Sequence, residues 1–289
     1  MTNMRYEAPT TLNDAISLLS NATGDARVLA GGTDLLVQLR AEMIEPELVV
    51  DIKRIPNLNT IVNDGGAFKI GAVTPCAIID EDGPLKKAWP GVVEASELIG
   101  STQIQGRASL GGNLCNASPA ADTVPALTAA GATITIAGPN KEREIPVEDL
   151  CQGPGQTSLA TGEVVVSFNL PERLPRSGDA YLRFIPRTEM DIAVVGVGVN
   201  VTLDGDGTCI AARVALGAVA ERVLLVEEAA ATLIGTKMET QDLQNLSAAA
   251  SAACRPIDDK RGTAEYRTKI AGVLARRAAI IANQRAGTA

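Results

Sequence analysis

The chain contains no histidine, and aromatic residues make up only 2% of its 289 residues. The absence of histidine excludes histidine general bases, Ser-His-Asp triads and the commonest metal ligand. It also excludes a flavin attached covalently through histidine. Because aromatic residues are scarce, the core must be built from alanine, valine, leucine and isoleucine.

Cysteines are few and scattered, at positions 76, 115, 151, 209 and 254. No two of them form a CxxC pair, which argues against a zinc or iron–sulfur site made by this chain alone. An odd, dispersed set is typical of reduced thiols in the cytoplasm. The N-terminus has no apolar signal core, and no apolar run reaches transmembrane length. We therefore expect a cytoplasmic protein with no transmembrane segment and no metal site of its own.

Positive charge is also limited, because the chain has 26 lysines and arginines but 34 acidic residues, and its net charge is −8. No basic stripe of the kind that nucleic-acid-binding proteins carry is visible. The charge balance therefore predicts a soluble protein that does not bind nucleic acid.

The hydrophobic pattern predicts an α+β fold with a boundary near residue 175. The segment 171–179 is rich in proline, glycine and charge, as linkers are. Before it we expect helices at 12–19, 34–39, 84–99 with a break near Pro90, and 122–132. We also expect strands at 27–30, 48–52 and 162–171, and hairpins at 60–74 and 132–147. After it we expect a three-stranded antiparallel sheet backed by helical stretches near 221–234, 240–253 and 263–284.

Two pairs of adjacent glycines are the most informative local feature. Gly31 and Gly32 lie in "LAGGTDLL", and Gly111 and Gly112 lie in "ASLGGN". Each pair alone is consistent with a tight strand-to-helix turn. Adjacent glycines do not fit the G-x-G-x-x-G pattern of Rossmann folds. The G-x-G of "GVGVNV" at 196–201 lies in an alternating strand, and we interpret it as strand only.

A functional interpretation of the two pairs is also open. Without a Cβ, backbone N–H groups can approach an oxyanion closely, and a following helix adds its positive end. Thr33, Ser109 and Asn113 add polar side chains nearby. Two such loops facing each other would hold a diphosphate from both sides. On this hypothesis, a branched side chain at Gly32 would intrude where the phosphate sits and would restrict the backbone.

Asp122 follows the second glycine pair in "NASPAADTVPAL". It either caps the helix that contains Pro125 or accepts a hydrogen bond from a hydroxyl of a ligand. The residue pattern alone leaves both interpretations open.

Taken together, these stretches resemble one family, the FAD-binding medium subunits of the molybdenum hydroxylases, which include xanthine dehydrogenase and carbon monoxide dehydrogenase. The matching stretches are "YEAPTTLNDAISLL", "LAGGTDLL", "ASLGGNLCNASPAADTVPAL", "AYLRFIPRTEMDIAVVGVGVNV" and the C-terminal helices. The resemblance covers essentially the whole chain in order. One branch of the family holds an extra iron–sulfur cluster with four cysteines, and this chain lacks that set.

The resemblance implies a fold in two parts. Residues 1–175 would form an FAD-binding domain of the vanillyl-alcohol-oxidase (PCMH) type, with subdomains of about 1–55 and 56–175. Residues 176–289 would form the C-terminal domain that is typical of carbon monoxide dehydrogenase flavoproteins.

The resemblance also assigns cofactor-binding residues, and no catalytic or metal residues. The first loop would wrap the diphosphate and ribityl part of FAD with Leu29, Ala30, Gly31, Gly32, Thr33, Asp34, Leu35 and Leu36. The second loop would hold the diphosphate from the other side with Ala108, Ser109, Leu110, Gly111, Gly112 and Asn113.

Four further positions carry over from the family. Asp122 would accept a hydrogen bond from a hydroxyl of FAD, and Val165 would contact the adenine through its backbone. Arg183 stands where relatives often have a lysine near the flavin ring, although its planar head differs from an ammonium group. A surface strand residue is the alternative interpretation of Arg183. Ile99 stands where some members stack an aromatic side chain on the flavin.

The function that the resemblance implies is electron transfer within a larger enzyme. A large partner subunit would bind the molybdenum cofactor, and a small partner would carry two [2Fe–2S] clusters, as a dimer of heterotrimers. Electrons would reach FAD from the clusters and leave to an external acceptor. Two alternatives stay open, a stand-alone FAD-dependent reductase with Ser101, Cys115 or Tyr181 as proton donor, and a scaffold subunit that has lost its cofactor.

Overall fold

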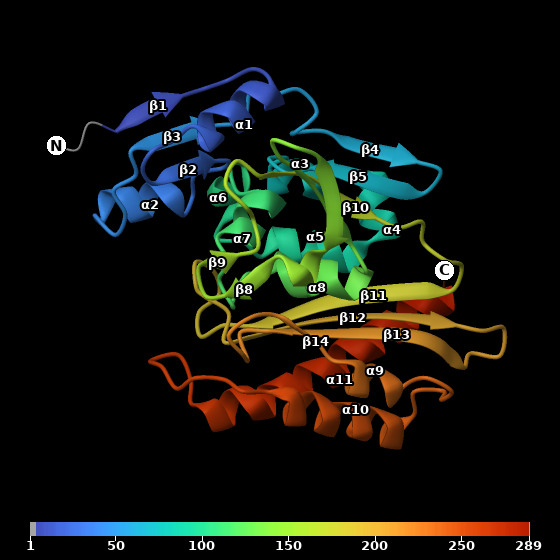
Figure 1. Ribbon diagram of the computed structural model, residues 1–289. Helices are drawn as coiled ribbons and strands as arrows, with labels where there is room; N and C mark the ends of the chain where they lie inside the picture. The colour runs from blue at the N-terminus through green and yellow to red at the C-terminus, as the bar shows by residue number, and fades with distance from the viewer. Residues whose placement is uncertain (1–3, 289) are drawn as a thin grey trace.

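The computed structural model describes residues 4–288, which form four β-sheets with helices between and beside them (Figure 1). The three-stranded and five-stranded sheets lie on one side of a layer of helices, drawn in teal and green. The four-stranded sheet lies on the other side of this layer. Orange and red helices cover its outer face, so that helices flank the four-stranded sheet on both sides.

The three-stranded sheet has the order β1-β3-β2, and both neighbouring pairs run parallel. Its strands and connecting helices are β1 (Arg5–Glu7), α1 (Leu12–Ser20), β2 (Ala26–Leu29), α2 (Leu35–Arg40) and β3 (Leu48–Asp51). The side chain of Thr11 caps α1 by accepting a hydrogen bond from the Asp14 N–H at 3.1 Å. The first glycine loop follows β2 directly and therefore lies at the carboxyl edge of this sheet.

The five-stranded sheet is entirely antiparallel and has the order β4-β5-β10-β6-β7. Its strands are β4 (Ile61–Asp64), β5 (Ala67–Gly71), β6 (Thr133–Ala137), β7 (Glu142–Pro146) and β10 (Val164–Leu170). The β4–β5 hairpin turns at Gly65 and Gly66, whose φ angles of +62° and +100° favour glycine. Both expected hairpins are thus confirmed. A separate two-stranded ribbon consists of β8 (Cys151–Gly153) and β9 (Gln156–Thr157).

The helical layer comes from the middle of the chain. Its helices are α3 (Cys76–Glu81), α4 (Gly83–Ala88), α5 (Pro90–Glu97), α6 (Thr102–Gln105), α7 (Leu110–Cys115) and α8 (Thr123–Ala130). The break expected near Pro90 separates α4 from α5. Trp89 leaves the helical conformation there, with φ −130° and ψ 62°, and the proline starts the next helix where its missing N–H costs nothing.

The C-terminal sheet has four strands, so the expected count of three is wrong. Its order is β11-β12-β13-β14, with β11 (Ser177–Phe184), β12 (Val195–Leu203), β13 (Cys209–Gly217) and β14 (Leu224–Leu225). The short β14 pairs with Ala215 and Leu216. A strand of two residues shows no alternation of apolar and polar side chains, so the sequence does not reveal it. Leu224 and Leu225 also lie in a stretch that we expected to be helical. As a result α9 (Glu227–Ala231) is shorter than expected, whereas α10 (Thr240–Ala253) and α11 (Ala264–Thr288) lie close to the expected ranges.

Glycines of the four-stranded sheet allow α8 to pack closely against it. A Cβ atom on Gly198 would lie 2.4 Å from the carbonyl oxygen of Pro125, and one on Gly217 would lie 2.7 Å from Cγ of the same proline. The G-x-G at 196–198 is therefore strand, as expected, and it also has a packing role that the alternation did not reveal.

The longest helix, α11, spans the four-stranded sheet and buries a row of alanines against it, including Ala275, Ala278 and Ala282. None of the helices in residues 4–288 combines the length and apolar character that a membrane span requires.

Candidate functional site

The two glycine loops lie against each other in space. A Cβ atom on Gly31 would lie 1.9 Å from the carbonyl oxygen of Arg107 and 3.1 Å from the backbone nitrogen of Ala108. A Cβ on Gly112 would lie 3.9 Å from Cβ of Ala30. The loops thus meet backbone to backbone, and Gly31 is required by this contact.

The first loop presents a row of free backbone donors. Among residues 4–288, no acceptor pairs with the N–H groups of Gly31, Gly32, Thr33 or Asp34. Helix α2 starts immediately afterwards, and the side chain of its N-cap residue, Asp34, makes no capping hydrogen bond. Free backbone N–H groups in a loop of this kind can donate to an anion.

The second loop differs, because its backbone donors are largely engaged within the protein. The N–H of Gly111 donates to the Ala72 carbonyl at 2.9 Å, and that of Asn113 donates to the Ser109 carbonyl at 2.9 Å. The N–H of Gly112 donates to Oγ of Ser109 at 3.2 Å. This glycine pair lies inside the first turn of α7, so the second loop acts mainly as a rigid wall opposite the first.

Of the two expected reasons for glycine at position 32, the structure supports the restriction of the backbone and not the intrusion on a phosphate. The φ angle of Gly32 is +79°, and a Cβ there would lie 2.9 Å from Cδ1 of Leu29 and 3.4 Å from Cδ1 of Leu36. Neither leucine lines the cavity described next. A side chain at Gly32 would therefore meet these leucines and strain the backbone, and it would not point at a phosphate.

A cavity of about 490 Å³ opens beside the two loops. This volume is in the range of small-molecule and cofactor sites. Thirteen of the residues assigned from the resemblance line it, namely Ala30, Gly31, Gly32, Thr33, Asp34, Leu35, Ile99, Ala108, Ser109, Gly111, Gly112, Asn113 and Val165.

Five assigned residues do not line the cavity. Leu29 and Leu36 lie behind Gly32, and Leu36 is 47% exposed. Leu110 is completely buried in the core. Asp122 and Arg183 form a buried pair with each other.

The Asp122 carboxylate is held by two side chains of β11. Nη1 of Arg183 donates to Oδ2 at 2.8 Å, and the hydroxyl of Tyr181 donates to Oδ1 at 3.0 Å. The Arg183 side chain is only 3% exposed, so the surface interpretation of this residue is wrong. Burial raises the pKa of Asp122 to about 6, although Arg183 and Tyr181 oppose this shift.

The capping interpretation of Asp122 is also wrong, because its side chain makes no capping hydrogen bond to α8. Asn113 performs this task instead. Its Oδ1 accepts hydrogen bonds from the N–H of Thr123 at 3.2 Å and from the Thr123 hydroxyl at 2.7 Å. A residue of the cavity wall is thereby bonded to the immediate neighbour of Asp122.

Sequence reasoning missed much of the opposite wall. Residues 157 and 159–164, from the ribbon strand β9 to the start of β10, line the cavity together with Asp25, Arg27, Gln38, Cys115 and Asn116. Glu163 holds this segment by pairing with Arg143 at 2.8 Å and by accepting a hydrogen bond from the Ala160 N–H at 2.8 Å. The segment has no composition or spacing that distinguishes it from an ordinary loop.

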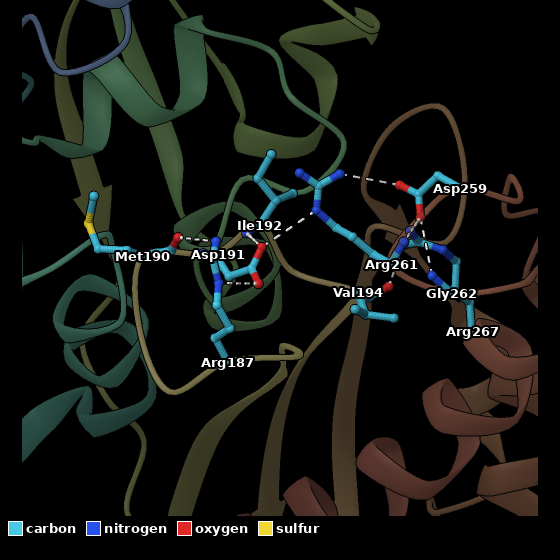
Figure 2. A network of polar contacts seen from close by, with 9 residues as sticks. All are labelled: Arg187, Met190, Asp191, Ile192, Val194, Asp259, Arg261, Gly262 and Arg267. Carbon is cyan, nitrogen blue, oxygen red and sulfur yellow. Dashed lines mark hydrogen bonds and ion pairs between the residues drawn. The ribbon is translucent and has the colours of Figure 1, made fainter.

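The loop between β11 and β12 belongs to a network of polar contacts that reaches the start of α11 (Figure 2). The N–H of Met190 donates to the carbonyl of Gly100 at 3.2 Å, beside the cavity residue Ile99. Asp191 accepts from Nε of Arg187 at 3.1 Å and lies 3.6 Å from Nε of Arg261. These contacts tie the loop to Gly100 through Met190 and to Arg261 through Asp191.

Arg267 is the buried centre of the same network and is only 4% exposed. It donates to the carbonyls of Val194 at 2.7 Å and Ala218 at 3.3 Å, and it pairs with Asp259 at 2.6 Å. Figure 2 shows Arg261 and Arg267 on either side of the Asp259 carboxylate. These bonds join the end of the β11–β12 loop to the start of α11.

The described part of the chain, residues 4–288, holds no cluster of three or more cysteine and acidic side chains that could bind a metal ion. The five cysteines are free, and Cys115 alone among them is exposed, within the cavity.

Comparison with known proteins identifies the family. Residues 2–173 match the FAD binding domain in molybdopterin dehydrogenase, and residues 180–282 match the CO dehydrogenase flavoprotein C-terminal domain. The carbon monoxide dehydrogenase medium chain of Afipia carboxidovorans is 34% identical, over 97% of both chains. The xanthine dehydrogenase FAD-binding subunit of Escherichia coli O157:H7 is 30% identical, over 91% of this chain and 90% of that one.

Solved structures give the same result. Carbon monoxide dehydrogenase from Hydrogenophaga pseudoflava superimposes with a TM-score of 0.94 at 33% identity, over 98% of both chains. Quinoline 2-oxidoreductase from Pseudomonas putida 86 superimposes with a TM-score of 0.90 at 28% identity, also over 98% of both chains. The family matches cover both halves of the chain, and the first match is an FAD-binding domain. The chain therefore belongs to the FAD-binding medium subunits of molybdenum hydroxylase-type oxidoreductases, the family that the sequence resembles.

Proposed function

We propose that this chain serves electron transfer between the [2Fe–2S] clusters of a partner subunit and an external acceptor, with FAD as its redox group. The observation that carries the proposal is the row of four free N–H groups at Gly31–Asp34, which line one cavity together with the second glycine loop. Bound FAD supplies one- and two-electron redox chemistry. The protein's own task is to bind and orient the cofactor.

The first loop has the chemistry to hold the diphosphate of FAD. Each hydrogen bond to a charged group contributes about 1.5–3 kcal/mol. The repulsion from the acidic protein as a whole is screened beyond about 8 Å at physiological ionic strength. The local donors therefore outweigh the distant negative charge, and the wall formed by Gly111 and Gly112 confines the anion.

The remaining parts of the cavity fit the other ends of the cofactor. Val165 and residues 159–164 form the wall that we assign to the adenosine end. Ile99 and the loop 187–192 are close to the end that we assign to the flavin ring. Asp122 would accept a hydrogen bond from a hydroxyl of the cofactor, and Arg183 would place positive charge near the reduced ring. Because neither residue lines the cavity, both roles require a rearrangement when FAD binds.

We further propose the domain and subunit organisation. Residues 1–175 form a two-part FAD domain of the PCMH type, and residues 176–289 form the C-terminal domain. A large subunit with the molybdenum cofactor and a small subunit with two [2Fe–2S] clusters complete a heterotrimer, which dimerises. No side chain of this chain acts as an acid or base on the organic substrate.

A stand-alone reductase is the second candidate function, and the site offers it poor proton donors. The Tyr181 hydroxyl is committed to Asp122, and burial raises its pKa well above 10. The protein atoms around its sulfur raise the pKa of Cys115 to about 12, and the Ser101 hydroxyl donates to Gln103.

Native mass analysis of the protein purified from its source, with identification of the released cofactor, tests the proposal. We expect one FAD for each copy of this chain and co-purification with two partner chains. Flavin-containing protein that reduces a substrate without partners would favour the stand-alone reductase. Colourless protein within a complex would favour the scaffold.

A further inference from the structure

The buried Asp122 carboxylate receives one donor on each of its oxygens, and both donors come from the same face of β11. Tyr181 and Arg183 stand two positions apart on this strand, so their side chains project to the same side. The Tyr181 hydroxyl lies 3.0 Å from Oδ1, and Nη1 of Arg183 lies 2.8 Å from Oδ2. Tyr181 is 2% exposed and Asp122 is 8% exposed. The carboxylate therefore cannot rotate without losing a buried hydrogen bond.

The space for the Tyr181 hydroxyl exists because residue 196 is glycine. Gly196 lies on the neighbouring strand β12, where it pairs with Arg183. A Cβ atom on Gly196 would lie 2.5 Å from the phenol oxygen and 3.3 Å from Cζ of the ring. A hydroxyl at position 181 and a side chain at position 196 therefore exclude each other.

The same two strands also determine where Asp122 stands. Helix α8 begins at the next residue, Thr123, and it packs against β12 through the close contact between Gly198 and Pro125. Thr123 in turn donates two hydrogen bonds to Asn113 in the cavity wall. The orientation of Asp122 is thereby coupled to the cavity on one side and to β11 and β12 on the other.

We propose that Tyr181 is a positioning residue, which fixes the Asp122 carboxylate beside the flavin-nucleotide site, and that Gly196 is retained to admit its hydroxyl. This inference rests on the proposed function, because the carboxylate is assigned to FAD there. The groups that act on the Asp122 carboxylate are Arg183 and Tyr181, both from β11, and they oppose the effect of burial. Removing the phenol hydroxyl should raise the pKa of Asp122 further above its present value of about 6.

The primary test measures the FAD affinity of the full-length apoprotein between about pH 5 and pH 8, by the quenching of flavin fluorescence. We expect the affinity of the wild type to fall as the pH drops through the pKa of Asp122. In Tyr181→Phe, the midpoint should lie about one pH unit higher, and the affinity at pH 6 should be about fivefold weaker. Tyr266→Phe is the matched control, because Tyr266 is 40% exposed and its hydroxyl has no hydrogen-bond partner within residues 4–288. Its pH profile should equal that of the wild type.

A second measurement does not depend on FAD. Gly196→Ala should lower the stability of the wild type to urea, and the loss should be much smaller in the Tyr181→Phe background, because the nearest clashing atom is then absent. Equal losses in both backgrounds, or a Tyr181→Phe profile that matches the wild type, would overturn the inference. A wild-type chain that binds no FAD at any pH would instead refute the proposed function, and the inference with it.

Discussion

Gly31 and Arg107 are far apart in the sequence, yet their backbones touch where the two glycine loops meet. A Cβ atom on Gly31 would lie 1.9 Å from the carbonyl oxygen of Arg107. No side-chain rearrangement can relieve this contact, because the clashing atom belongs to the backbone. The pairing of the loops depends on the missing side chain at this position.

Gly31→Ala should therefore separate the two loops and weaken FAD binding. Overpacking of this kind costs about 1–3 kcal/mol, which corresponds to a loss of affinity between about 5-fold and about 150-fold. The flavin content of the purified chain and the affinity of the apoprotein measure the effect. Gly205→Ala is the control, because nothing lies within 4 Å of its position in the turn after β12. Full flavin content in Gly31→Ala would contradict the assigned role of this contact.

Cys115 should report whether FAD fills the cavity. It lines the cavity and is exposed there, whereas the other four cysteines are buried. A maleimide should label one thiol of the native apoprotein, slowly, because the protein atoms around its sulfur raise the pKa of Cys115 to about 12 and little thiolate is present. At an FAD concentration about one hundred times Kd, labelling should slow about a hundredfold, since only the free protein reacts.

Mass analysis of the labelled protein counts the modified thiols, and Cys115→Ala should remove the labelling. Labelling of Cys115 at an unchanged rate in saturating FAD would show that the cofactor binds elsewhere.

Asp179 should make the protein less stable as the pH rises, which is unusual for a carboxyl group. Its carboxylate is 3% exposed, accepts from the Gly91 N–H at 2.9 Å and lies 2.9 Å from Nη1 of Arg173. Burial raises its pKa to about 6, from 3.8, against the opposing effect of Arg173. A raised carboxyl pKa contributes stability that is fully present below the unfolded pKa and is lost as the pH rises through the folded pKa.

As the pH rises from about 4 to about 7, the wild type should thus lose up to about 3 kcal/mol of unfolding free energy relative to Asp179→Asn. Urea denaturation at several pH values measures it, and Asp206→Asn in the exposed β12–β13 turn is the control. A difference that stays constant over this range would mean that Asp179 titrates normally.

Arg267→Met should be strongly destabilising. The change removes the donors to the Val194 and Ala218 carbonyls and leaves Asp259 without its closest cation. Leaving a buried carbonyl without its donor costs about 1–3 kcal/mol, whereas the exposed Asp259 carboxylate can be hydrated. Guanidinium denaturation measures the loss, and Arg276→Met, on the exposed side of α11, should lie within about 0.5 kcal/mol of wild type. A loss for Arg267→Met as small as that of the control would show that the network in Figure 2 is not a stability element.

The sequence by itself determined the local elements and the family. Thr11 caps α1, Gly65 and Gly66 turn a hairpin, and Pro90 separates α4 from α5, because each depends on a few adjacent residues. Both glycine pairs were visible as candidate anion loops for the same reason. The order of several such stretches along the whole chain identified the family, which the comparisons confirm.

Only the tertiary structure decided how distant residues meet. It placed Gly31 against Arg107, turned the Cβ direction of Gly32 toward two leucines, and supplied residues 159–164 as a cavity wall. It also buried Arg183 against Asp122 and added β14 to the C-terminal sheet. Periodicity and turn chemistry describe a residue's immediate neighbours, whereas these contacts arise from the packing of sheets and helices whose sequences are far apart. That packing therefore determines which glycines are indispensable and which polar groups line the cavity.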